Sequence, residues 1–315
     1  MDDYNLYPLH IFRVVARLGG VTRAAETLHV SQPAISAHLR ALEQRCGRPL
    51  FERTPRGMRL TEAGAAVLDQ ANRLFALYEE IPGLLDALEG QVRGGVVVAC
   101  SSTPAAWLLP ARLQAFQRQY PGTEPELLVG DSAEVLKWLR DYRAALGVIG
   151  ELQVDDEWIR LPIASDELRL VAAAGDSLAR ARRIGPARLR DRTLFLREEG
   201  SSTRAGAQAL LGETIRDFRR VVEIRNAEAV KQAVISGLGL AVMSSWATGL
   251  EEKAGLLRPV SDRAFRLDRR FYLVRKKDRE LRGVAAALWG HLAEGTQESD
   301  RNQKASSRLS AMMTF

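Results

Sequence analysis

Apolar residues recur every three or four positions through the first fifty residues of the chain, which is the spacing of helices with one buried face. The pattern from Leu9 to Ala16 predicts a helix that ends at Gly19-Gly20. A second short helix follows, with Thr22 placed to cap it, and Ser31 is placed to cap a third. The buried face of the third helix consists of Ile35, Leu39, Leu42 and Cys46.

The second and third helices are joined by a turn at His29-Val30, and Ala24-Ala25 let them approach closely. This arrangement predicts a helix-turn-helix, whose second helix enters the major groove of DNA. Its short side chains suit this role, because bulky ones would hold the backbone away from the base edges. The alternative is a helical hairpin with a solvated face. The residues of this helix expected to contact DNA are Ser31, Gln32, Pro33, Ser36, Ala37 and Arg40.

A basic hairpin is predicted directly after these helices. Two short extended runs, residues 50–53 and 58–60, flank a turn at Pro55-Arg56-Gly57 and indicate a β-wing. The wing carries Arg53, Arg56 and Arg59, and arginine suits contact with phosphates or with the minor groove. Residues 1–60 are therefore expected to form a winged helix-turn-helix domain that binds double-stranded DNA.

The order and content of residues 6–64 resemble the DNA-binding domain of the LysR-type transcriptional regulators. The residues that carry the resemblance are Phe12, Ala24-Ala25, Leu28, Ser31-Gln32-Pro33-Ala34, Ser36, Leu42-Glu43, Gly47, Leu50-Phe51, Arg53 and Leu60-Thr61-Glu62-Ala63-Gly64. Gly20 departs from the family, which usually has Ser there, and a lost helix cap is the expected consequence. The resemblance implies a regulator that binds an interrupted palindrome, with RNA polymerase as a further candidate partner.

A long helix is predicted from Thr61 toward Gly90, and residues 61–91 are expected to be a linker. Its apolar positions are spaced alternately four and three apart, as in a two-helix coiled coil: Val67, Ala71, Leu74, Tyr78, Ile81, Leu85 and Leu88. The alternative is an amphipathic helix that lies on its own domain. Pro82 is expected to kink the helix near Tyr78. The seam predicts a dimer; the family resemblance implies the same pairing and favours a tetramer.

Strand and helix patterns alternate beyond Gly94-Gly95, which predicts an α/β fold with a mainly parallel sheet. Strands are expected at 96–100, 126–129, 145–149, 168–173, 194–196, 221–224, 240–243 and 271–274, and helices at 105–119, 133–141 and 281–292. The resemblance implies a two-lobed effector domain, similar to periplasmic binding proteins. Residues 92–162 with 267–294 would form the first lobe and 163–266 the second. Residues 295–315 are polar and expected to be a disordered tail.

Polar segments are expected at the cleft between the lobes, since ligands of such sheets bind outside the carboxyl ends of the strands. A helix N-terminus that carries Ser and Thr suits an anion. The expected effector-binding residues are Ser101, Ser102, Thr103, Ser201, Ser202, Thr203, Asn226 and Lys231. The alternative for each segment is helix capping without a ligand.

The cleft segments resemble the subgroup that contains the CbbR and CysL regulators. This resemblance implies a small anion, or a phosphorylated or redox metabolite, as the effector. Ala144-Ala145 depart from the family pattern, which usually has Asp at the start of that strand. The departure puts in doubt any effector contact or hinge bond at that position.

Charge is distributed unevenly along the chain, although the formal net charge is only +6. Residues 1–60 hold nine Arg and five acidic residues, whereas residues 61–90 hold one Arg and six acidic residues. A basic head before an acidic helix favours an anionic partner at the N-terminal end. The sequence shows neither a signal peptide nor an apolar run of about 18 residues, so a cytoplasmic protein without membrane contact is expected. Cys46 and Cys100 are expected to be reduced thiols.

No catalytic constellation, metal-ligand spacing or cofactor motif is visible in the sequence. The His residues at 10, 29, 38 and 291 are scattered, and "SGLGLA" lacks the spacing of a phosphate-binding loop. A transcriptional regulator that responds to a small molecule is therefore favoured over an enzyme. One alternative is a two-lobed solute-binding protein or enzyme fused to a DNA-binding head. Another is a DNA-organising protein without effector control.

Overall fold

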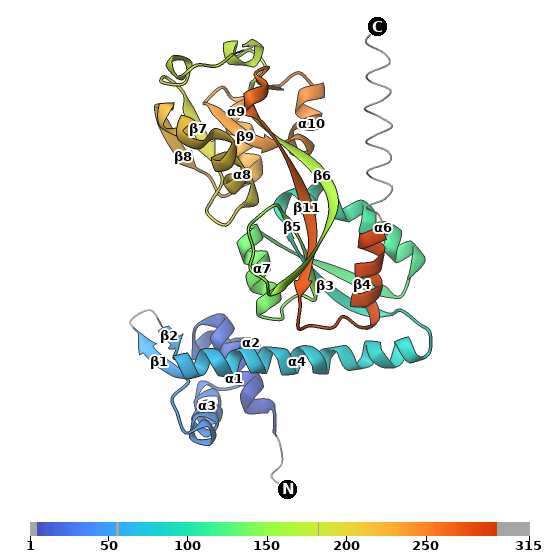
Figure 1. Ribbon diagram of the computed structural model, residues 1–315. Coiled ribbons are helices and arrows are strands. Elements are labelled where there is room, and N and C mark those ends of the chain that lie inside the picture. Colours follow the sequence, from blue (N-terminus) through green and yellow to red (C-terminus); the bar gives the residue numbers. More distant parts are fainter. Residues whose placement is uncertain (1–4, 55–56, 182, 295–315) are drawn as a thin grey trace. The chain divides into compact units, whose positions relative to one another are not determined.

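The computed structural model describes residues 5–54, 57–181 and 183–294 of the chain. The expected tail, residues 295–315, and Arg56 of the expected wing lie outside the described residues. The chain divides into two compact units, and the division falls in the long helix between Ile81 and Pro82. Figure 1 labels helices and strands of both units.

The first unit begins with a helical head and a small wing. Its elements are α1 (Tyr7–Leu18), α2 (Val21–Leu28), α3 (Gln32–Cys46), β1 (Phe51–Thr54) and β2 (Gly57–Leu60), with β1 and β2 antiparallel. Side chains from all three helices meet in one core, in which Phe12, Ile35 and Leu50 are almost fully buried. Ala24 and Ala25 are also buried there, so the close approach predicted from these small side chains is confirmed.

Caps fix where the helices of the head begin. The hydroxyl of Ser31 accepts a hydrogen bond from the Ala34 N–H at 3.3 Å, as predicted. The cap predicted at Thr22 is wrong, because α2 already begins at Val21 and Thr22 lies in its first turn. The N-cap residue is Gly20, which has no side chain to bond the free N–H groups of the first turn.

The linker helix, α4 (Glu62–Leu88), leaves the head directly after β2. The Thr61 hydroxyl caps it by accepting a hydrogen bond from the Gly64 N–H at 3.0 Å. The exposure of the predicted coiled-coil seam changes along the helix: Ala71 is 1% exposed within the head, whereas Tyr78 is 64% exposed. Leu74, Ile81 and Leu85 are exposed as well. Pro82 lies inside the helix and does not end it.

The second unit alternates strands and helices. Its elements are β3 (Gly94–Ser101), α5 (Ser102–Trp107), α6 (Leu109–Gln119), β4 (Thr123–Gly130), α7 (Ser132–Arg140), β5 (Leu146–Gly150), β6 (Trp158–Ala173), β7 (Thr193–Leu196), α8 (Ser202–Leu211), β8 (Arg220–Glu223), α9 (Ala227–Ile235), β9 (Leu240–Ser244), α10 (Ser245–Lys253), β10 (Leu257–Pro259) and β11 (Arg266–Lys276). Short 3-10 helices lie at Ser177–Arg180, Pro186–Arg188, Gly212–Asp217 and Arg263–Phe265, and residues 283–294 form a last helix.

One sheet runs through the second unit in the order β4-β3-β5-β11-β6-β9-β7-β8, with β10 paired to β6. β3 is parallel to β4 and β5, and β7 is parallel to β8 and β9. The long strands β6 and β11 pair with each other and with their other neighbours in antiparallel fashion. The sheet is therefore mixed, and the expectation of a mainly parallel sheet holds only at its two ends.

The strands β6 and β11 cross between two lobes, each with its own core (Figure 1). Ile163, Ala164 and Phe271 belong to the core of the first lobe, and Leu168 and Leu170 to that of the second. The paired segments between these positions, residues 165–167 and 268–270, are polar and contribute to neither core. We refer to these two polar segments between the lobes as the hinge.

Two predicted elements differ in the structure. The strand expected at 168–173 begins earlier, at Trp158, because β6 continues through Pro162 at a shift in register opposite Phe271 and Tyr272. Proline is tolerated in a strand at such a bulge, where no ladder N–H is needed. The helix expected at 105–119 is divided at Leu108, with Pro110 in the first turn of α6. Ala144 and Ala145 are buried and apolar, so they pack the first lobe.

We expect Gly64→Ala to destabilise the head, although alanine is the better helix former. A Cβ at position 64 would lie 2.0 Å from the Leu50 carbonyl oxygen, so the helix or the wing must shift. A loss of about 1–3 kcal/mol in the free energy of unfolding is expected, as for overpacking. Gly20→Ser is the matched control. It meets no atom within 4 Å and supplies a cap, so a gain of a few tenths of a kcal/mol is expected. Chemical denaturation of the full chain measures both, and unchanged stability of Gly64→Ala would contradict the clash.

Candidate functional site

The side chains expected to contact bases lie on one open face of α3. Gln32, Pro33, Ala37 and Arg40 are exposed and Ser36 is half-buried, while Ile35 and Leu39 on the opposite face are buried. Positions 33, 36, 37 and 40 follow the spacing of one helix face. Their contact with DNA stays a prediction. Such contact requires that these side chains be exposed together on one face of the helix, and α3 has such a face.

The wing is tied to α3 by a carboxylate. Glu43 accepts hydrogen bonds from the N–H groups of Leu50 and Phe51, at 2.8 and 3.3 Å, and so fixes the start of β1. On the wing, Arg59 Nε donates to Glu52 at 2.6 Å. Both side chains are largely exposed, so this pair is weak and a DNA phosphate can replace the carboxylate. Arg53 belongs to β1 beside them.

In the second unit, two predicted hydroxyl segments lie where strands of opposite lobes end. Ser101 ends β3 and precedes α5, and Ser201 precedes α8. Neither residue makes a side-chain cap bond to its helix, although both are 6% exposed. Ser202 and Thr103 are also buried. Simple capping therefore does not account for these hydroxyls.

Two buried arginines join the hydroxyls, and the sequence prediction of the site missed both. Arg197 Nη1 donates to the Ser102 hydroxyl at 3.2 Å, and Arg269 Nη1 donates to the Thr203 hydroxyl at 3.2 Å. A signal for Arg269 was present, because it shares its strand face with the buried Phe271 and Leu273 at a spacing of two. A charged residue in such a row is unusual in a core.

The lobes touch each other around these residues. Ser102 belongs to the first lobe and Arg197 to the second, so their hydrogen bond crosses between lobes. A second crossing bond runs from the Ala133 N–H to the Gly200 carbonyl at 3.2 Å. A Cβ at Gly150 would lie 2.2 Å from the Ser202 hydroxyl oxygen, so only glycine fits there. We call Arg197, Arg269, Ser102, Ser202 and Thr203 the cleft cluster.

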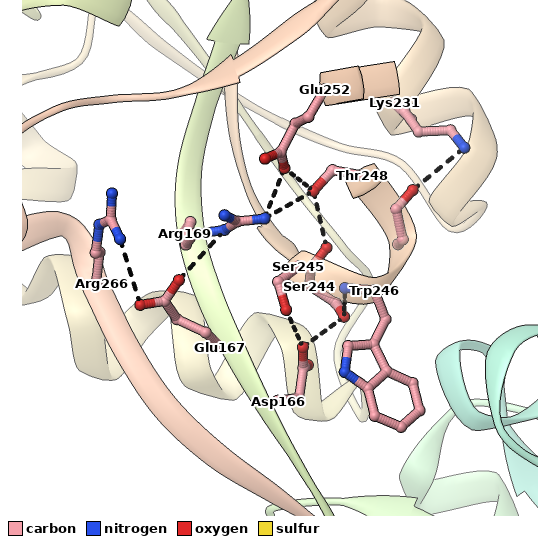
Figure 2. A network of polar contacts seen from close by, with 11 residues as sticks. Asp166, Glu167, Arg169, Lys231, Ser244, Ser245, Trp246, Thr248, Glu252 and Arg266 are labelled. Carbon is pink, nitrogen blue, oxygen red and sulfur yellow. Dashed lines mark hydrogen bonds and ion pairs between the residues drawn. The ribbon is translucent and has the colours of Figure 1, made fainter. Parts of the chain in front are cut away.

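The Arg269 guanidinium is held in place by a buried carboxylate. Its Nε donates to Asp166 at 2.7 Å, and the two side chains are 3% and 0% exposed. Asp166 also accepts hydrogen bonds from the hydroxyls of Ser244 and Ser245, at 2.8 and 3.0 Å, at the start of α10 (Figure 2). Arg269 Nη2 is buried and has no hydrogen-bond partner among the described residues.

Electrostatics at the cluster follow from this burial. Burial lowers the pKa of Arg269, the Asp166 carboxylate opposes that shift, and the nearby Arg197 guanidinium adds to it. An arginine still stays protonated in a protein. Burial also raises the pKa of Cys100, beside Ser101, to about 12, so this thiol is not a nucleophile.

Asn226 and Lys231 have other partners in the structure. Asn226 caps α9 by accepting a hydrogen bond from the Ala229 N–H at 2.9 Å. Lys231 is paired with Glu251 at 2.6 Å and Glu228 at 2.9 Å, and thereby joins α9 to α10. Burial by itself would lower the pKa of Lys231, but these two carboxylates raise it. No contact among the described residues brings either side chain to the cleft cluster, and their role as effector ligands stays a prediction.

A polar groove runs along the crossing strands. Its volume is about 840 Å³, and its lining includes Asp166, Arg269 and Ser245 together with Arg169 and Glu167. Arg169 is paired with Glu252 at 2.6 Å, so that arginine already has its counter-ion (Figure 2). In the part of the chain that the structure describes, no group of His, Cys, Asp or Glu is placed to hold a metal ion. No helix among those residues is long and apolar enough to span a bilayer.

Comparisons with known families match nearly the whole chain. Residues 6–65 match the profile described as "Bacterial regulatory helix-turn-helix protein, lysR family". Residues 89–297 match the profile described as "LysR substrate binding domain". These two ranges correspond to the helical head and to the two-lobed unit.

Relatives with established names are regulators. The chain is 34% identical over 284 residues to the RuBisCO operon transcriptional regulator of Allochromatium vinosum, covering 90% of this chain and 94% of that protein. It is 29% identical over 292 residues to the transcriptional activator CmpR of Synechocystis, covering 93% and 96%.

Solved structures with the same fold include a regulatory domain and a full-length regulator. The regulatory domain of Synechocystis CcmR in complex with 2-PG matches with a TM-score of 0.59 and 25% identity, covering 65% of this chain and 98% of that one. A full-length OxyR variant of Pseudomonas aeruginosa matches with a TM-score of 0.67 and 21% identity, covering 94% and 96%. With both domain profiles matched and relatives that are regulators rather than enzymes, the protein belongs to the LysR family of DNA-binding transcriptional regulators and carries an effector-binding domain.

Proposed function

We propose that this regulator senses a small anion that binds at the cleft cluster, with Arg269 as its main anchor. The single observation that carries the proposal is the buried Nη2 of Arg269, which lacks a partner among the described residues. A buried N–H group without a partner is costly, and more so when it is charged. An anion that accepts this N–H, with the hydroxyls of Ser202 and Thr203 beside it, would remove that cost.

The relatives support a phosphorylated metabolite as the anion. One relative is a RuBisCO operon transcriptional regulator, and another is the transcriptional activator CmpR. The regulatory domain of CcmR, a third relative, was solved in complex with 2-PG. Tetrahedral dianions suit a site with two guanidinium groups and several hydroxyls, because each oxygen can accept more than one hydrogen bond. We therefore infer that the effector is a phosphate ester or a similar dianion.

Through the hinge segments, anion binding at the cleft cluster would change the arrangement of the two lobes. Arg269 belongs to β11 and Asp166 to β6, so both lie on the polar hinge segments between the two cores. Ser102 comes from one lobe, and Thr203 and Arg197 come from the other. An anion that binds better when the lobes are closed shifts the population toward closure, by no more than its difference in affinity for the two states.

The first unit supplies the output. The exposed face of α3 and the wing arginines would bind one half-site, and the exposed apolar side chains of α4 would pair with a second copy of the chain. Pairing gives a dimer, which matches an interrupted palindrome in DNA by symmetry. We further propose that dimers assemble into a tetramer and that the protein acts in the cytoplasm, beside the chromosome. A contact with RNA polymerase would complete an activating role.

Gln32→Ala is expected to relax base preference without removing DNA binding. Glutamine can make two hydrogen bonds to adenine in the major groove, so its loss should cost about 1–3 kcal/mol at the matched site only. Quantitative binding to the matched site and to random DNA, at one salt concentration, measures the difference. Gln44→Ala, on the far end of the same helix, is the control. Equal losses on both DNA substrates would remove Gln32 from the base-reading residues.

Sulfate and phosphoglycolate are expected to raise the thermal stability of the full chain. A ligand at 100 times its dissociation constant adds about 2.7 kcal/mol, which is a readily measured shift in Tm. The double variant Arg269→Gln with Asp166→Asn removes the anchor without leaving one buried charge alone, and it should abolish the shift. The matched control is Arg192→Gln with Asp176→Asn, since this is also a hydrogen-bonded pair of arginine and aspartate but lies elsewhere in the second lobe. A shift that survives in the Arg269 double variant would contradict the proposed anchor.

A further inference from the structure

Arg197, the second arginine of the cleft cluster, is already occupied by a carboxylate of the protein itself. Its Nε donates to Glu198 Oε2 at 2.8 Å and its Nη2 donates to Glu198 Oε1 at 2.5 Å. This two-pronged pairing is the geometry with which an arginine binds a phosphate or a carboxylate ligand. Only Nη1 points elsewhere, to the Ser102 hydroxyl. The neighbour in sequence thus occupies the position that an anion would take on this guanidinium.

Each arginine of the cleft cluster is already paired with a carboxylate of the protein. Arg197 and Arg269 contribute two positive charges, and Asp166 and Glu198 contribute two negative ones. An anion on the same edge of the Arg197 guanidinium would meet the Glu198 carboxylate, and two like charges at one guanidinium repel each other strongly in a low dielectric. One of the two carboxylates must therefore move away from its arginine when an anion binds.

The surroundings of the two carboxylates decide which one moves. Asp166 is 0% exposed and is held by Arg269 and by the hydroxyls of Ser244 and Ser245. Glu198 is 10% exposed, and among the described residues its carboxylate is hydrogen-bonded only to Arg197. Releasing Asp166 from Arg269 would also break its two hydrogen bonds with Ser244 and Ser245, whereas Glu198 can turn toward solvent by changing its rotamer.

We propose that Glu198 is a built-in counter-ion that the effector anion displaces from Arg197, and that this exchange sets the affinity and the charge selectivity of the site. This inference rests on the proposed function of the cleft cluster. A monoanion only replaces the charge that Glu198 withdraws, whereas a dianion adds one more favourable charge between the two arginines. The site therefore discriminates against monoanions of the cell, such as simple carboxylates, without any steric filter.

The test compares sulfate, a dianion, with acetate, a monoanion, on the full chain at constant ionic strength. Dissociation constants come from Tm measured against anion concentration. Glu198→Gln is expected to bind sulfate about tenfold more tightly than the unchanged protein, which corresponds to roughly 1.4 kcal/mol for one partly screened charge. Its preference for sulfate over acetate is expected to fall. Asp176→Asn, in the Arg192 pair, is the matched control and should change neither quantity.

A second variant separates the position of the carboxylate from its charge. Glu198→Asp keeps the charge but shortens the side chain, so the carboxylate no longer reaches the guanidinium. If this variant also binds sulfate more tightly than the unchanged protein, the result supports displacement of Glu198. The variant also keeps the proposal testable if Glu198→Gln does not fold. Suppose that the Arg269 and Asp166 double variant loses sulfate binding, but that the Glu198 variants bind sulfate as the unchanged protein does, or more weakly. This result overturns the counter-ion role of Glu198 and leaves the proposed function standing. No sulfate binding by any of these proteins overturns both.

Discussion

The buried pair of Arg269 and Asp166 is the interaction on which the second unit depends. It lies where the two crossing strands leave one hydrophobic core and have not yet entered the other. Apolar side chains at these positions would join the cores into one and fix the angle between the lobes. A hydrogen-bonded ion pair instead keeps the hinge polar, and breaking such a pair costs about 3–5 kcal/mol because one charge is left unpaired. The pair thus holds the two crossing strands together in the polar segment between the lobes.

The cleft cluster gains its chemistry from the same pair. Asp166 takes one edge of the Arg269 guanidinium and directs the other toward the hydroxyls at the start of α8. Arg197, the second arginine of the cleft cluster, is paired with its own carboxylate, Glu198. In the proposed function, effector binding is linked to the arrangement of the lobes, because Arg269, the proposed anchor of the anion, lies on a strand that crosses between them.

The head follows a different constraint, because it must hold a short helix rigidly at an open surface. Small side chains at Ala24 and Ala25 allow close packing, and Glu43 joins α3 to the wing through two backbone N–H groups. Both features are local in sequence. The family likeness of the head was accordingly visible from residues 6–64, and the matched profile over residues 6–65 confirms it.

The sequence by itself determined the family, the winged head, the start of the linker helix at Thr61 and the alternation of strands and helices. These depend on caps, turns and periodic apolar positions, which act within a few residues. It misplaced the cap of α2 and missed the start of β6 at Trp158 and the break at Leu108, where the deciding contacts are neighbouring strands and backbone geometry. Only the tertiary structure brought Arg197 and Arg269 to the hydroxyls, because those contacts join residues 95 and 66 positions apart. A local pattern can show that a segment is suited to an anion, but pairing between distant charges decides which groups remain free to bind one.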